Sequence, residues 1–292
     1  MAAVKLYLVD GTYELFRNYF GAPPKRAWDG REVGATLGLL RSLAALLARP
    51  EVTHIACAFD HVIESFRNDL YPGYKTSAGI DPELLAQFPL AEEATSALGV
   101  VVWPMVEFEA DDALAAAAAK FRNEPSVEQI VICSPDKDMT QMVSGSRIVC
   151  WDRRREIVLD ETGVVEKFGV APRSIPDWLA LVGDAADGYP GIPGCGARSA
   201  SAVLSRFGHL ESIPDDPRQF GLSSGRAARL AESLAARREE ALLYRRLATL
   251  REDVPLGEKR DDLEWQGARS RLKELCIAWG DPQLPKRISR WR

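Results

Sequence analysis

The chain has 292 residues, of which 46% are hydrophobic and 27% are charged, and its net charge is −5. This composition is typical of a soluble globular protein, and the length allows one large domain or two smaller ones. No apolar run approaches the ~20 residues that cross a bilayer, and the N-terminus shows no signal peptide. Five scattered cysteines without a CxxC pair favour a cytoplasmic protein with reduced thiols and do not resemble zinc ligands.

The first half of the chain alternates between apolar, strand-like runs and helical patterns. Strands are predicted at residues 5–10, 53–60, 100–104, 128–134 and 146–152, and helices at 36–48, 81–98 and 109–121. Near-continuous apolar strands are typical of a parallel sheet that is covered on both faces. The order of the elements therefore predicts an α/β domain with a mostly parallel sheet.

Helices dominate after about residue 172. They are predicted at residues 174–183, 197–208, 225–250 and 269–279, with a short returning strand at 253–256. We place the domain boundary near residue 170, which gives an α/β domain at 1–170 and a helical region at 171–292.

Nine carboxylates lie at the predicted strand ends and helix starts. They are Asp10, Asp60, Glu109, Asp111, Asp112, Asp136, Asp138, Asp184 and Asp187. Each alone could cap a helix, but the joint pattern is harder to explain, because gathering so many acids without cations is strongly repulsive. Hard cations such as Mg²⁺ bind through carboxylates and substrate phosphate, and ligands bind at the carboxyl ends of parallel strands. The pattern therefore favours a divalent-metal site of a nuclease.

A glycine-rich turn, GIPGCGARS, follows the last two acids directly. Gly191, Gly194 and Gly196 permit conformations and close approaches that a side chain blocks, and the next helix points N–H groups at the turn. Arg198 adds a charge and Ser199 a hydroxyl. The alternative is a plain helix–turn–helix corner, but the position beside the acids favours a phosphate-binding turn.

The segment SFRNDLYPGYKTSAGID lies between two of the acid groups. Arg67 and Lys75 could place cations beside the metals, and Tyr74 a stacking ring. A solvated loop is the alternative. The acidic net charge is a weak objection to a nucleic-acid partner, because local charge decides phosphate binding and basic residues collect late in the chain.

In this order the motifs VDG, FR…YK, EADD, SPDKDM, LVGD..D..PG and PG.G resemble the 5′-nuclease family. That family includes flap endonucleases, phage 5′-exonucleases and the 5′-nuclease domain of bacterial DNA polymerase I. The match is closest to the bacterial branch and covers nearly the whole chain. The resemblance implies a PIN-like α/β core with flanking helices, followed by a helix–three-turn–helix region that holds duplex DNA.

The resemblance also implies roles for individual residues. One metal ion would use Asp10, Asp60, Glu109 and Asp111, and a second would use Asp111, Asp136, Asp138 and Asp187. Asp112 and Asp184 match only the bacterial branch and are expected to act on the ions through water. Lys75 resembles the active-site lysine, Arg67 a phosphate contact and Phe16 a stacking ring, and the GIPGCG turn resembles a site where K⁺ bridges carbonyls to a DNA phosphate.

Two departures from the family pattern concern residues that are expected to bind the substrate. TSAGI follows YK where a basic residue is usual, and GDAADGYPG lacks hydroxyls that are common there. We expect a free-standing, monomeric 5′-3′ exonuclease and flap endonuclease that acts on DNA with 5′ ends or flaps through two Mg²⁺ or Mn²⁺ ions. The alternatives are a PIN-type ribonuclease, which does not need the helical half, and a non-catalytic binder of branched DNA.

Overall fold

The computed structural model describes residues 3–292, and these residues form two compact units. In the described part of the chain, the first unit comprises residues 3–63, 77–134 and 252–292. The second unit comprises residues 64–76 and 135–251. The chain therefore leaves the first unit and returns to it twice.

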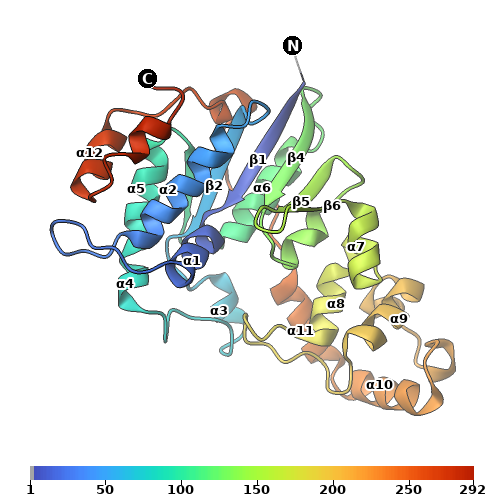
Figure 1. Cartoon of the computed structure of the whole chain (residues 1–292). Helices are drawn as coiled ribbons and strands as arrows, with labels where there is room; N and C mark the ends of the chain where they lie inside the picture. The colour runs from blue at the N-terminus through green and yellow to red at the C-terminus, as the bar shows by residue number, and fades with distance from the viewer. Residues whose placement is uncertain (1–2) are drawn as a thin grey trace. The chain divides into compact units, whose positions relative to one another are not determined.

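A parallel sheet forms the centre of the first unit (Figure 1). Its strands lie in the order β3-β2-β1-β4, with bounds β1 Val4–Asp10, β2 His54–Asp60, β3 Val101–Met105 and β4 Val127–Cys133. Leu6 and Leu8 of β1 and Phe59 of β2 are fully buried, as expected of strands covered on both faces. Asp10 and Asp60 are the last residues of neighbouring parallel strands, so they end at the same edge of the sheet.

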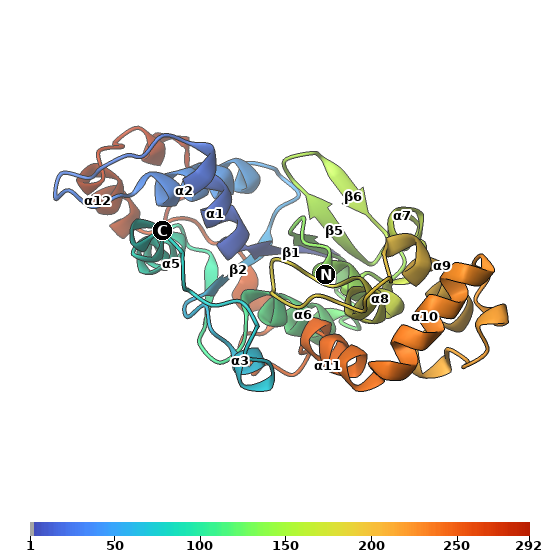
Figure 2. The ribbon, with the colours of Figure 1, turned by 90° about the horizontal axis from the view of Figure 1, so that it is seen from below.

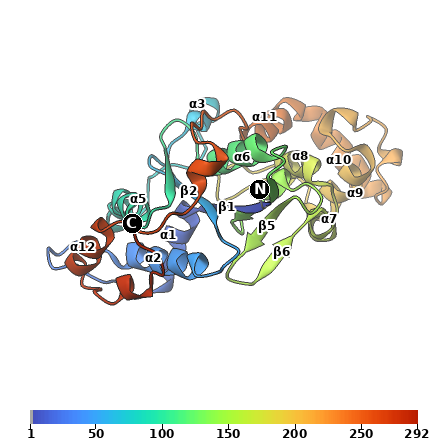
Figure 3. The same cartoon turned by 90° about the horizontal axis from the view of Figure 1, so that it is seen from above.

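Helices cover both faces of this sheet, and Figure 3 shows α2 and α6 on opposite sides of β1 and β2. The helices of the first unit are α1 Gly11–Gly21, α2 Gly34–Leu47, α4 Pro82–Leu85, α5 Gln87–Ala97, α6 Ala110–Phe121 and α12 Arg271–Ala278, with 3₁₀ turns at Arg260–Leu263 and Leu284–Arg287. The alanine-rich α6 packs closely because Ala113, Ala115 and Ala117 are buried without bulk. Its first turn brings Glu109 and the residues that follow toward the acidic sheet edge.

The second unit is mainly helical (Figure 2). Its elements are α3 Phe66–Leu70, α7 Glu161–Phe168, α8 Ile175–Val182, α9 Ala197–Phe207, α10 Ser224–Ala236 and α11 Arg238–Ala248, the antiparallel strands β5 Ile148–Asp152 and β6 Ile157–Leu159, and 3₁₀ turns at Asp138–Met142, Pro172–Ser174, Leu210–Ser212 and Pro217–Gln219. Asp177 ties α8 to its neighbours, since its buried carboxylate accepts bonds from His209 Nδ1 at 2.8 Å and Arg245 Nη1 at 3.3 Å. This packing joins α8 to the segment that follows α9 and to α11.

The predicted α/β class and the predicted helical second half are confirmed. The predicted strand at 253–256 is wrong: Leu256 donates its N–H to Val254 O at 2.9 Å, and its carbonyl accepts from Lys120 Nζ at 2.6 Å, so no ladder forms. The predicted helix 81–98 is divided into α4 and α5, because Pro89 has no N–H for a bond to Leu85.

Several other elements differ from the expectation. The predicted helix 225–250 breaks at Arg237, whose backbone leaves the helical region (φ −132°, ψ 28°) although no proline or glycine marks the break. Helices α1, α3 and α7 and strand β6 were not among the predicted elements. The boundary near residue 170 stays a prediction. Among the described residues, every helix is too short or too polar to cross a bilayer.

Candidate active site

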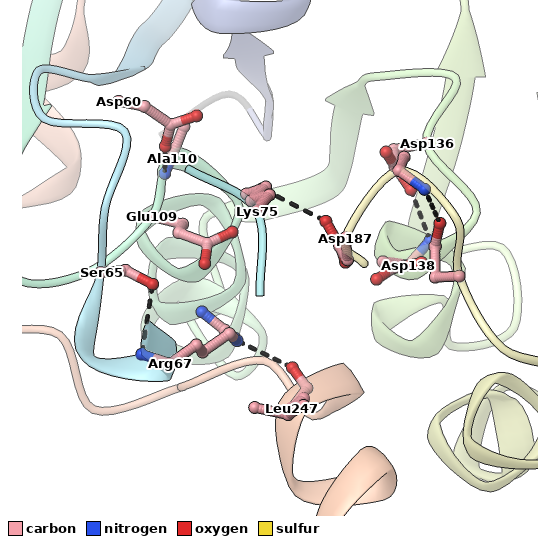
Figure 4. Close-up of polar contacts among 12 residues, drawn as sticks. Asp60, Ser65, Arg67, Lys75, Glu109, Ala110, Asp136, Asp138, Asp187 and Leu247 are labelled. Atoms are coloured by element: carbon pink, nitrogen blue, oxygen red, sulfur yellow. Dashed lines mark hydrogen bonds and ion pairs between the residues drawn. The ribbon is translucent and has the colours of Figure 1, made fainter. Parts of the chain in front are cut away.

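The two strand-end acids of the first unit are buried and held by hydrogen bonds. Asp10 Oδ1 accepts from the Tyr13 N–H at 2.8 Å and caps α1, while Asp10 Oδ2 accepts from Ser134 Oγ at 2.8 Å. Asp60 Oδ1 accepts from the Ala110 N–H, the first residue of α6, at 2.6 Å (Figure 4). The fold therefore orients both carboxylates through main-chain and hydroxyl donors.

The start of α6 carries the other three acids of this unit. Glu109 is its N-cap and forms a capping box with Asp112, whose Oδ2 accepts from the Glu109 N–H at 3.0 Å. Glu109 and Asp112 are buried, whereas Asp111 is half-buried on the same first turn. Acids in this position also interact favourably with the helix dipole. The capping of α6 therefore explains why an acid stands at position 112 even if Asp112 binds no metal.

The second unit brings three other predicted acids together. One carboxylate oxygen from each of Asp138, Asp184 and Asp187 lies within 4.8 Å of the others. Asp138 is 7% exposed, and its Oδ1 is a buried atom without a hydrogen-bond partner. Burial, and after it the charges of Asp136 and Asp187, raise the pKa of Asp138 well above its usual range.

A buried carboxylate oxygen without a donor destabilises the folded state by about 1–3 kcal/mol. Such an oxygen therefore indicates a place where a cation or a hydrogen-bond donor binds. Three oxygens at this separation fit a hard divalent cation, which prefers oxygen ligands. Asp136 is exposed and supports the group by accepting the Asp138 N–H at 2.9 Å (Figure 4). The residues present therefore suit a divalent metal.

Lys75 lies beside this group. Its Nζ is 3.4 Å from Asp187 Oδ1, and its main-chain N–H donates to Asp187 O at 3.0 Å (Figure 4). The ring of Tyr74 lies under the ammonium at 5.7 Å and is buried. Tyr74 thus supports Lys75 from within the unit and offers little surface for stacking on a base.

Arg67 occupies a different environment from that of Lys75. Its side chain is 1% exposed, Nε donates to Leu247 O at 2.7 Å and Nη2 donates to Thr249 O at 3.2 Å (Figure 4). These carbonyls lie at the end of α11, where the last helical C=O groups need donors. In this conformation the guanidinium fastens α3 to α11.

The glycine turn precedes α9 in the second unit. Gly191 and Gly194 have left-handed φ values of 71° and 78°, which favour glycine. A Cβ on Gly191 would also lie 2.4 Å from Gly183 N, whereas Gly196 is the N-cap of α9 with an ordinary φ. Arg198 is exposed and Ser199 half-buried in the first turn of this helix.

Phe16 lies in the first unit and is half-buried. Its ring packs edge-on against Phe88 at 6.1 Å and lies 6.3 Å from Phe20, which is 74% exposed. The sequence pattern did not mark Phe20, Ser134 or Lys137 as site residues, although Ser134 and Lys137 contact the acids. Ser134 directly follows the end of a strand, and Lys137 lies between two acids in the chain. Their positions could therefore have identified them as residues near the site.

Known proteins resemble the chain over most of its length. The model of the 5'-3' exonuclease N-terminal resolvase-like domain matches residues 5–169, and that of the 5'-3' exonuclease C-terminal SAM fold matches residues 170–271. The 5'-3' exonuclease of Aquifex aeolicus (strain VF5) is 33% identical over 271 residues, which cover 92% of this chain and 91% of that protein.

DNA polymerase I of Bacillus caldotenax is 32% identical over 269 residues, which cover 90% of this chain but 30% of that protein. The chain thus spans about a third of the length of such polymerase relatives. The T5 D15 protein, solved with metal ions, shares the fold with a TM-score of 0.66 at 17% identity, covering 97% of this chain and 96% of that one. The catalytic core of Rad2 has a TM-score of 0.61 at 13% identity, covering 98% and 90%. The chain belongs to the 5′-3′ exonuclease family of nucleases.

Proposed function

We propose that this protein is a metal-dependent 5′-3′ exonuclease and flap endonuclease that hydrolyses DNA phosphodiesters. The observation that carries the proposal is the group formed by Asp138, Asp184 and Asp187, together with the buried Asp138 Oδ1, which has no hydrogen-bond donor. The membership of the family supports the reaction class. Among proteins of the same fold, T5 D15 is a flap endonuclease that was solved with DNA and metal ions.

We assign one divalent ion to the acids of the first unit, Asp10, Asp60, Glu109 and Asp111, and one to Asp136, Asp138 and Asp187 of the second unit. Mg²⁺ or Mn²⁺ bound there supplies Lewis acidity, which activates water and stabilises the leaving oxygen. The two acids specific to the bacterial branch differ. Asp184 belongs to the group of three in the second unit, which supports a direct or water-mediated role, whereas Asp112 already accepts the Glu109 N–H.

Lys75 is proposed to offset negative charge on the phosphate in the transition state. Its contact with Asp187 holds the ammonium beside the acids, and the side chain remains partly accessible to a substrate. The predicted phosphate contact of Arg67 requires the guanidinium to exchange its bonds to Leu247 and Thr249 for a phosphate. Arg67 is therefore the weaker of the two assignments.

DNA binding is assigned to the turn before α9, where Gly191, Gly194 and Gly196 allow close approach of a backbone phosphate. Arg198 and Ser199 then supply a charge and a hydroxyl from the first turn of the helix. A K⁺ ion at this turn stays a prediction, as do stacking roles for Phe16 and Tyr74, whose rings are largely packed against other side chains. A monomeric state and a cytoplasmic location also stay predictions.

A digest of a 5′-end-labelled flap duplex, with Mg²⁺ or with a chelator, tests this function. We expect Mg²⁺-dependent release of the labelled strand near the junction, and no comparable cleavage of single-stranded RNA of the same sequence. Preferential RNA cleavage would instead support a PIN-type ribonuclease. Tight flap binding without any cleavage in Mg²⁺ or Mn²⁺ would identify a non-catalytic binder.

A further inference from the structure

Lys137 lies between Asp136 and Asp138 in the chain and makes close contact with the acid group of the second unit. Its Nζ forms a hydrogen-bonded ion pair with Asp184 Oδ2 and lies 3.8 Å from Asp138 Oδ1. The side chain is 34% exposed, so it is anchored among the acids but can still reach solvent.

The two oxygens of Asp184 have different partners. Oδ1 accepts the Ala186 N–H at 2.9 Å, a bond that the loop itself fixes. Oδ2 is therefore the oxygen that can turn to a cation, and the ammonium of Lys137 is bound to it. The distance from Lys137 to Asp138 Oδ1 is too long for a hydrogen bond, so the lysine offsets the charge of Asp138 without satisfying the oxygen.

We propose that Lys137 is the internal counter-cation of this group: it holds the acids together in the metal-free protein and leaves Asp184 when a divalent ion binds. This inference rests on the proposed metal-dependent function. A divalent ion bound at Asp184 Oδ2 would lie close to the ammonium of Lys137 on the same oxygen, and two cations at this separation repel each other. Lys137 therefore lowers the affinity for the ion while it stabilises the metal-free fold.

The role belongs to Lys137 and differs from that of Lys75. Lys75 is fixed by its own main-chain bond to Asp187 as well as by its ammonium. In contrast, Lys137 holds Asp184 only through a long, flexible side chain that must lose rotamer freedom to do so. Its release therefore regains entropy, which makes Lys137 the exchangeable cation of the pair.

Calorimetric titration of the whole chain with Mn²⁺ in the absence of DNA tests this role, using Lys137→Met and the control Lys167→Met. Lys167 is an exposed lysine of α7 in the same unit, so its loss changes the net charge equally. We expect Lys137→Met to bind Mn²⁺ about tenfold more tightly than wild type and to melt at a lower temperature without metal. The Lys167→Met variant should match wild type.

Chemical acetylation of wild-type lysines, followed by mass spectrometry, provides a second measurement that needs no variant. Mn²⁺ should increase the labelling of Lys137 and leave that of Lys167 unchanged. If wild type binds no Mn²⁺, the proposed function and this inference both fail. If wild type binds Mn²⁺ while Lys137 labelling stays constant, or if Lys137→Met binds no more tightly, the metal site stands and the counter-cation role is wrong.

Discussion

The acids of the first unit and those of the second unit are held by different kinds of partner. Asp10 and Asp60 accept bonds from main-chain N–H groups and a serine hydroxyl, which are fixed parts of the fold. In the second unit, Asp184 and Asp187 pair with lysine ammonium groups, and one oxygen of Asp138 has no donor.

The difference indicates two degrees of preorganisation. Main-chain N–H groups and a hydroxyl orient the carboxylates of the first unit without cancelling their charge. These carboxylates are therefore oriented for a cation, and they keep their hydrogen bonds without one. In the second group, burial and then the charges of Asp136 and Asp187 raise the pKa of Asp138, and the ammonium groups of Lys75 and Lys137 offset part of the negative charge. We therefore expect metal binding and substitutions in the second group to change the free energy of unfolding of the protein more than those in the first group.

Asp136→Asn should have the largest effect. The amide oxygen can still accept the Asp138 N–H, so the fold should persist, while the lost charge should reduce cleavage by at least about 10³-fold. Flap binding in Ca²⁺ should survive. Asp152→Asn, at the end of β5, is the matched control, because Asp152 caps a turn outside the group. Near-normal turnover of Asp136→Asn would remove Asp136 from the metal site.

Stability changes of opposite sign should separate the two groups. Asp138→Asn removes a buried, repelled charge and should stabilise the metal-free protein by about 1 kcal/mol or more. Asp10→Ala removes the N-cap of α1 and should destabilise the metal-free protein by about 1 kcal/mol. Urea unfolding in chelator measures both values. Changes of the same sign would contradict the comparison.

The pH dependence of stability should reflect Asp138. Its pKa is higher in the folded chain than in the unfolded chain, so the folded state binds more protons between these two values. The metal-free protein should therefore lose stability as the pH rises from about 4 through the folded pKa. Urea unfolding over this range should show a flatter profile for Asp138→Asn. An equal slope in both proteins would assign the effect to other groups.

Arg198→Ala should have the smallest effect and should leave both acid groups unchanged. Arg198 is exposed in the first turn of α9, so its expected task is to hold a phosphate. We expect a raised KM, little change in the single-turnover rate at saturating DNA, and a slope of log K against log salt that is lower by about one. Unchanged affinity with a collapsed rate would assign the turn to catalysis.

Strand periodicity could indicate where some of the acids lie, because Asp10 and Asp60 end strands and Glu109 precedes a helix. Asp184 and Asp187, three residues apart, do come together with Asp138. The burial of Arg67 and Tyr74 was not predictable, since the five-residue helix α3 and the loop that follows it are too short to show a period that distinguishes inside from outside. The break at Arg237 likewise depends on tertiary packing, because the local residues favour a continuous helix.

The central claim is that the acids Asp138, Asp184 and Asp187 of the second unit bind a divalent cation. Thermal unfolding with and without millimolar Mn²⁺ tests this claim most directly. Binding to the folded state alone should stabilise wild type by about 2.7 kcal/mol at a metal concentration of 100 Kd. Asp138→Asn should lose most of this gain while starting from a higher melting temperature in chelator. A wild-type melting temperature that is indifferent to Mn²⁺ would contradict the account.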